Sequence, residues 1–131
     1  MFIWKSRLRW GDTDASGRVY YVSLFRHLEA AEMEFLRDLG YVYGTGELQP
    51  VTFPRVHAEC DYTSALVNDD VMDIAVTVER VGSASFTLTF DVTVEGRHAA
   101  RGKVVVVCMD RQTQRSRPLP GKFAETLRAA S

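Results

Sequence analysis

The sequence has little of what marks several specialised classes of protein. Only two cysteines, Cys60 and Cys108, occur in 131 residues, which is too few for a disulfide framework. No run of about 18 apolar residues occurs, so no segment is expected to span a membrane. The first residues also lack the apolar stretch of a secretory signal. We therefore expect a cytoplasmic location and two reduced, buried thiols.

Patterns typical of common cofactor and metal sites are missing as well. There is no P-loop, no G-x-G-x-x-G segment and no G-x-S-x-G nucleophile turn. His27, His57 and His98 lie far apart in the sequence, and no C-x-x-C pair accompanies them. We interpret the three histidines as ordinary surface or strand residues, and we predict no metal site.

Neither sign of charge dominates the chain. Its 16 basic and 17 acidic side chains give a formal net charge of -1, which argues against a broad basic surface for nucleic acid. The charges are unevenly distributed, however. Residues 1–79 hold 7 basic and 13 acidic side chains, whereas residues 80–131 hold 9 and 4. Either this asymmetry arose by chance, or the basic segment meets an anionic partner.

Alternating apolar and polar residues predict five strands around one long helix. The strands are expected at residues 2–10, 54–62, 71–81, 85–95 and 97–109. Apolar residues at helical spacing predict an amphipathic helix over residues 22–39, ended by Gly40. Because the last four strands are joined by short turns, we expect them to run antiparallel to their neighbours.

The length of the chain is typical of one domain, and we expect residues 1–131 to form it. The order of elements predicts an α+β fold, with the long helix packed on a five-stranded antiparallel sheet. Residues 41–54 are expected to form a loop, and residues 121–130 a short helix. The run from Val104 to Met109, which begins with four valines, is expected to be buried on both faces. Since one helix covers only one face of a sheet, we expect self-association.

A loop with two carboxylates stands between the first predicted strand and the long helix. Aspartate is favoured as a helix cap or turn residue, which explains either Asp12 or Asp14. It does not readily explain both in a loop bounded by Gly11 and Gly17. The alternative is a carboxylate held beside a helix N-terminus that binds an oxyanion, an arrangement suited to attack on a carbonyl.

The chain resembles hotdog-fold acyl-CoA thioesterases of the 4-hydroxybenzoyl-CoA thioesterase class. The most specific match is the family pattern G-D-x-D-x-x-G-x-V-x-Y, at residues 11–21, followed by a helix of family type from Glu29 to Gly40. Further matches follow in the same order along the chain: Asp61-Tyr62, residues 82–86, residues 104–107, Asp110 with Thr113, and residues 118–120. Ala15 and Ser64 depart from the family, in which many members have proline.

The resemblance implies hydrolysis of an acyl-CoA thioester without a metal or redox cofactor, since coenzyme A is part of the substrate. It implies that Asp14 acts as nucleophile or general base. The backbone N–H at Tyr21 would polarise the thioester carbonyl. Asp12 would organise the loop, and Gly17 would allow a backbone conformation that a side chain would prevent.

Substrate-binding residues are expected in the basic segment and near the helix. The phosphates of coenzyme A favour basic and hydroxyl partners. The candidates are Arg80, Ser83, Ser85, Arg97, Arg101 and Lys103. Solvated strand charges are the alternative interpretation. Tyr21, Phe25 and Phe53 are candidates for the acyl pocket.

The resemblance also implies a homodimer or a dimer-of-dimers tetramer, with sites at the subunit interface. Two other functions remain open at this point. The substrate could be carried by an acyl-carrier protein, or the chain could be a non-catalytic acyl-CoA binding module. A hotdog dehydratase is disfavoured, because such enzymes usually use a histidine with an acidic partner, and His27 is the one histidine in the loop or the helix start.

Overall fold

The computed structural model describes residues 1–131, which divide into two compact units. The first unit contains residues 1–35, 60–76 and 90–102. The second contains residues 36–59, 77–89 and 103–131. Neither of the two helices combines the length and the apolarity that crossing a membrane requires.

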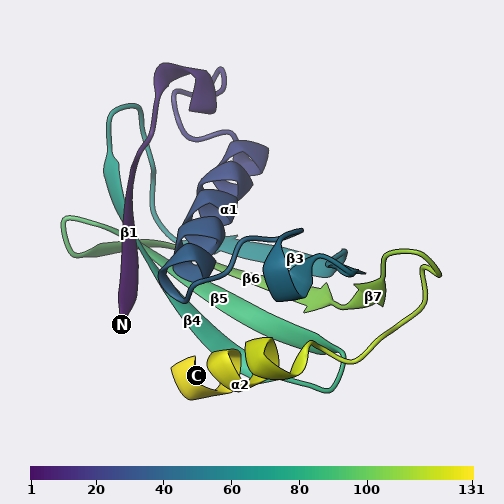
Figure 1. Ribbon diagram of the computed structural model, residues 1–131. Helices are drawn as coiled ribbons and strands as arrows, with labels where there is room; N and C mark the ends of the chain where they lie inside the picture. Colours follow the sequence, from purple (N-terminus) through teal and green to yellow (C-terminus); the bar gives the residue numbers. More distant parts are fainter. The chain divides into compact units, whose positions relative to one another are not determined.

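Five strands form one sheet in the order β1-β4-β5-β6-β3 (Figure 1). They are β1 (Phe2–Arg7), β3 (Arg55–Tyr62), β4 (Val71–Val81), β5 (Ser85–Val94) and β6 (Arg97–Val107). The long helix α1 (Tyr21–Asp38) packs on the sheet, and a short helix α2 (Gly121–Ala130) ends the chain. The predicted α+β fold, with one long helix on a five-stranded antiparallel sheet, is confirmed.

The first strand is shorter than its alternating pattern predicts. β1 pairs antiparallel with β4 and ends at Arg7 rather than at residue 10. The next residues form a 3-10 turn, η1 (Trp10–Asp12), which redirects the chain. Trp10, at the end of the strand predicted over residues 2–10, therefore lies in this turn and is 79% exposed.

The amphipathic pattern of α1 gives the first unit its core. The buried side chains of the helix in this unit include Leu24, Leu28, Ala31 and Phe35. Phe35 meets Phe2 of β1 edge to face, with ring centroids 5.6 Å apart. The helix ends at Asp38, and the predicted cap Gly40 follows it with a φ of 92°, which lets the Tyr41 N–H donate to the Leu36 carbonyl.

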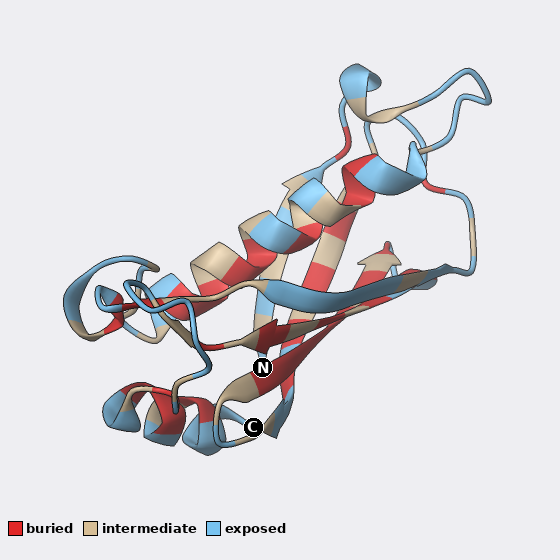
Figure 2. Ribbon diagram, turned by 90° about the vertical axis from the view of Figure 1, so that its right-hand side faces the viewer, coloured by how far each residue is buried: buried red, intermediate tan, exposed pale blue.

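The outermost strand β3 is exposed along nearly its whole length (Figure 2). Val56, an apolar residue of the strand predicted at residues 54–62, is 62% exposed. Cys60 is half-buried and Cys108 is buried, so the prediction of two buried thiols holds only for Cys108. An alternating pattern shows which residues share a face, but it does not show whether that face meets the core.

The second unit contains more regular structure than the sequence predicts. Residues 41–54, expected to be a loop, hold a 3-10 turn η2 (Gly46–Leu48) and a strand β2 (Val51–Thr52). Strand β2 pairs with β7 (Met109–Asp110) in a small second sheet. In the valine run, Val105 and Val107 are only half-buried, so the expected burial on both faces is wrong.

Candidate active site

The loop between η1 and α1 forms a tight turn around Asp14 at the beginning of the helix (Figure 1). The Gly17 N–H donates to the Asp14 carbonyl at 2.9 Å, and the Asp14 N–H donates to the Arg18 carbonyl at 3.0 Å. Gly17 has a φ of 78°, and no atom lies within 4 Å of the place a Cβ would occupy. The loop therefore needs glycine for its conformation and not for space.

Asp14 is an exposed, ionised carboxylate. Its Oδ1 accepts hydrogen bonds from the Ser16 hydroxyl at 2.6 Å and from the Ser16 N–H at 2.8 Å. These bonds hold the pKa of Asp14 below its ordinary value, because they stabilise the charged form. Both donors bond to Oδ1, so neither of them occupies Oδ2.

Neighbouring carbonyls use some of the backbone donors at the N-terminus of α1, but not the first N–H of the helix. The Tyr20 N–H donates to the Asp12 carbonyl and the Ser23 N–H to the Tyr20 carbonyl, each at 2.8 Å. Tyr21 is the first helical residue, so its N–H has no partner within the helix. The Tyr62 hydroxyl donates to the Tyr21 carbonyl at 2.5 Å, and burial raises the pKa of Tyr62. The peptide after Tyr21 is therefore held in place.

A cavity of about 290 Å³ opens at the same helix end. Arg18, Val19 and Tyr21 line it on one side, and residues 62–66 line it on the other. The start of α1 thus borders a space that a small molecule can enter. No group of three or more His, Cys, Asp or Glu side chains is arranged to hold a metal ion.

The side chain of Asp12 bonds to residues outside the Asp14 turn, whereas the side chain of Asp14 bonds only to Ser16. Burial raises its pKa, but hydrogen bonds from the Arg9 N–H and from His27, with nearby positive charge, outweigh burial and lower it overall. His27 is on α1 and its side chain is only 13% exposed, so its interpretation as a surface or strand residue is wrong. His27 also contacts Ser6 at 2.6 Å. The sequence offered one clue, because Ser6 is a polar residue on the inward face of β1.

The basic residues predicted to bind coenzyme A are mostly paired with neighbouring groups. Arg101 donates to Asp91 at 2.8 and 3.0 Å, and Lys103 lies 3.1 Å from Glu79. Arg97 donates to the Ser64 hydroxyl and the Ala65 carbonyl.

The remaining candidates lie around one turn of the second unit. Ser83 is exposed in the turn between β4 and β5, Ser85 begins β5, and Arg80 is exposed near the end of β4. Their role toward coenzyme A stays a prediction.

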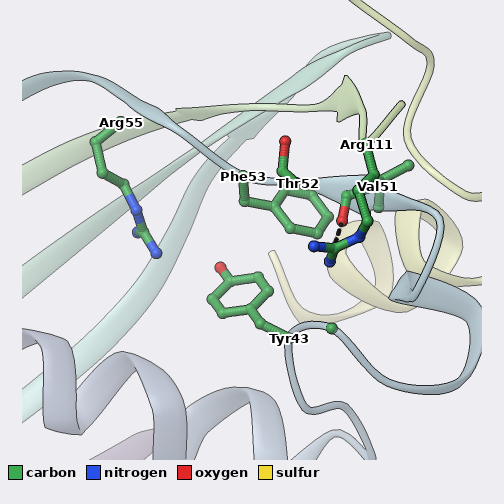
Figure 3. Close-up of a pocket in the computed structure, with 7 residues that line it drawn as sticks. Tyr43, Val51, Thr52, Phe53, Arg55 and Arg111 are labelled. Atoms are coloured by element: carbon green, nitrogen blue, oxygen red, sulfur yellow. Dashed lines mark hydrogen bonds between the residues drawn. The ribbon is translucent and has the colours of Figure 1, made fainter. Parts of the chain in front are cut away.

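The acyl-pocket candidates fall in different units. Phe53 lines a cavity of about 310 Å³ in the second unit, facing Tyr43 with ring centroids 4.9 Å apart (Figure 3). Arg55 lies over the Tyr43 ring, and Arg111 is fastened to the Gln49 and Val51 carbonyls. The other two candidates, Phe25 and Tyr21, belong to the first unit. A pocket shared by these residues stays a prediction.

The family is decided by a comparison that covers almost the whole chain. Residues 8–127 match the model of the thioesterase-like superfamily. The chain belongs to the thioesterase-like superfamily. This thioesterase-like protein therefore has the predicted hotdog fold, and the predicted enzyme class, a thioester hydrolase, is confirmed. The narrower 4-hydroxybenzoyl-CoA thioesterase class stays a prediction.

Individual relatives agree with this assignment. The thioesterase-like chain is 27% identical over 122 residues to a 1,4-dihydroxy-2-naphthoyl-CoA hydrolase of Synechococcus elongatus, covering 92% of this chain and 90% of the relative. It is 28% identical to a solved gentisyl-coenzyme A thioesterase, with a TM-score of 0.84 over 95% of this chain and 98% of that one. A Thermus thermophilus structure, 22% identical with a TM-score of 0.92 over 100% of both chains, shows the fold alone.

Proposed function

We propose that this protein hydrolyses an acyl-CoA thioester to a free acid and coenzyme A, with Asp14 as nucleophile or general base. The observation that carries the proposal is an ionised, exposed carboxylate on the loop that leads into the unpaired N–H groups of α1. The names of two relatives, a 1,4-dihydroxy-2-naphthoyl-CoA hydrolase and a gentisyl-coenzyme A thioesterase, support coenzyme A as the carrier of the acyl group.

Two routes are open to the Asp14 carboxylate. As a general base, it takes a proton from water while the water oxygen bonds to the carbonyl carbon, and the tetrahedral intermediate then expels the coenzyme A thiolate, which takes up a proton. As a nucleophile, it attacks the carbonyl carbon and displaces the thiolate, and water then hydrolyses the mixed anhydride. In both routes negative charge develops on the carbonyl oxygen. The Tyr21 N–H donates to that oxygen, and removing such a donor typically costs about 10²–10³ in rate.

The substrate class is tested by thiol release from a panel of thioesters. Purified protein is mixed with aromatic, short-chain and long-chain acyl-CoAs and with matched acyl-carrier-protein thioesters, and the free thiol is read with a dye. We expect turnover of at least one acyl-CoA at a higher kcat/KM than its carrier-protein counterpart. Faster turnover of the carrier-protein thioesters would replace coenzyme A by the carrier protein. Binding without any turnover would make the chain a binding module.

Reversing the charges of Arg101 and Lys103 on β6 is expected to raise the KM for acyl-CoA and to leave kcat nearly unchanged. Their ion pairs with Asp91 and Glu79 are partly exposed, and such pairs contribute about 0–1 kcal/mol, so a phosphate can replace the carboxylates. The measurement is steady-state kinetics of Arg101→Glu and Lys103→Glu. Lys5→Glu, which disrupts a comparable exposed pair with Asp73, is the control. An unchanged KM in both β6 variants would place coenzyme A elsewhere.

Self-association is expected to use the exposed edge strand β3. An edge strand with unpaired backbone groups and an exposed apolar residue is a template for pairing with a second chain. We expect Val56→Lys to shift the molar mass toward that of one 14.8 kDa chain in light scattering. Val42→Lys, at an exposed valine of the loop after α1, should keep the parent mass. Equal masses for the two variants would contradict assembly through β3.

A further inference from the structure

A chain of hydrogen bonds runs through the first unit and takes no part in the chemistry proposed above. Ser6 Oγ on β1 lies 2.6 Å from His27 Nδ1 on α1. His27 Nε2 lies 3.0 Å from Asp12 Oδ2 in the loop. The side chains of His27 and Asp12 are only 13% and 15% exposed. The three residues thus join a strand, a helix and the loop that carries Asp14.

The donors and acceptors of this chain can be assigned from Asp12. Its lowered pKa means that Asp12 is ionised near neutral pH and can only accept hydrogen bonds. His27 Nε2 therefore carries the proton that it donates to Asp12. In the neutral ring Nδ1 is then an acceptor, and the Ser6 hydroxyl donates to it. Each polar atom of the chain has a partner, so the arrangement fixes one orientation of the imidazole.

Asp12 connects His27 to the groups that act on the thioester, because it is bonded to the residues beside them. Its Oδ2 also accepts the Arg9 N–H at 2.8 Å, which closes the η1 turn. Its backbone carbonyl accepts the Tyr20 N–H at 2.8 Å, directly before the N–H of Tyr21. Asp14 follows Asp12 by two residues. A displacement of Asp12 would therefore move both the carboxylate and the oxyanion donor.

We propose that His27 is a positioning residue for this active site, which clamps Asp12 to α1 while Ser6 fixes the direction of its ring. This inference rests on the proposed function, because it concerns the placement of Asp14 and of the Tyr21 N–H. The clamp acts before substrate arrives, so its loss should lower kcat and leave KM nearly unchanged. A misplacement of about 1 Å in reacting groups can cost about 10²-fold in rate.

Two amide variants of His27 separate the two ends of the imidazole. In His27→Gln the side-chain amide reaches the position of Nε2 and can still donate to Asp12. In His27→Asn the amide reaches only the position of Nδ1, next to Ser6, and the contact with Asp12 is lost. We expect kcat of the Asn variant to fall by up to about 10²-fold, whereas the Gln variant recovers most of the parent value. Ser6→Ala should give a smaller loss of kcat than the Asn variant.

A second measurement reports on the clamp without any substrate. The Tyr20 N–H is held by the Asp12 carbonyl, so its hydrogen exchange should be faster in His27→Asn than in His27→Gln. Lys5→Gln, which removes an exposed ion pair on the same strand as Ser6, should leave exchange and kcat at parent values. Thermal unfolding of all variants shows which of them retain the fold.

The outcomes distinguish this inference from the proposed function. If Asp14→Asn is inactive and His27→Asn keeps the parent kcat, the inference is overturned and the proposed function stands. If the Gln and Asn variants lose kcat equally and their Tyr20 N–H groups exchange hydrogen at the same rate, His27 fills space and does not clamp Asp12. If Asp14→Asn keeps full activity, the proposed function fails, and with it the catalytic role of the clamp.

Discussion

Replacing Asp14 by asparagine is expected to lower kcat by about 10²–10⁴-fold, the range that a positioned general base contributes. The substitution keeps the size of the side chain and an Oδ1 that can accept the two bonds from Ser16. It removes the negative charge, which the lowered pKa of Asp14 otherwise maintains near neutral pH. Because Asp14 is exposed, the free energy of unfolding should change little. The measurements are steady-state thiol release and urea unfolding.

The matched control for this variant is Asp69→Asn, at another exposed aspartate of the first unit. Asp69 has a φ of 77°, which asparagine tolerates, so the control tests the loss of one surface charge together with its exposed ion pair to Arg7. We expect the control to keep the parent kcat. A thioester hydrolase that remained fully active without the Asp14 carboxylate would use neither of the two routes proposed for it.

Replacing Phe123 by alanine is expected to lower the free energy of unfolding by about 3–5 kcal/mol. Phe123 is fully buried on α2, and its ring lies 5.7 Å from the rings of both Phe53 and Phe86. The ring of Tyr41 is 4.9 Å away. A helix of 10 residues is marginal by itself in water, so α2 depends on this aromatic cluster for its place.

Urea unfolding measures the effect of Phe123→Ala, and Glu125→Ala on the exposed face of the same helix is its control. The control should change the free energy of unfolding by no more than about 0.5 kcal/mol. A loss below about 1 kcal/mol in Phe123→Ala would mean that the ring cluster does not hold α2.

The sequence predicts the positions of the helix and strands better than it predicts the exact end of β1 or the exposure of β3. Strong alternation over residues 85–95 and helical spacing over residues 22–39 locate β5 and α1 to within one residue. The end of β1 escapes prediction, because the η1 turn depends on a bond from the Arg9 N–H to the Asp12 side chain. The exposure of β3 escapes it as well, since strand order decides which apolar face lies at an edge.

In the candidate site, too, local features can be predicted from the sequence, and contacts between distant residues cannot. The loop that holds Asp14 and Gly17 can be predicted from the spacing of its residues, because a turn is a local structure, whereas the roles of both residues come from the family resemblance and stay predictions. The partners Ser6 and His27 are separated by 21 residues and belong to different elements, so only the folded backbone brings them together. The pairing of Arg101 with Asp91 is equally invisible in the sequence, because it depends on the register of neighbouring strands.

The free space at the Cβ position of Gly17 bears on which enantiomer of an amino acid the turn accepts. A φ of 78° is disfavoured for L residues, and nothing stands where a Cβ would point. The turn therefore disfavours an L residue at position 17 because of its φ, and not because a side chain lacks space. The mirror-image residue D-alanine has its preferred backbone region at positive φ, so we expect a semisynthetic protein with D-alanine at position 17 to keep the φ of the turn around Asp14, whereas L-alanine would strain the same turn.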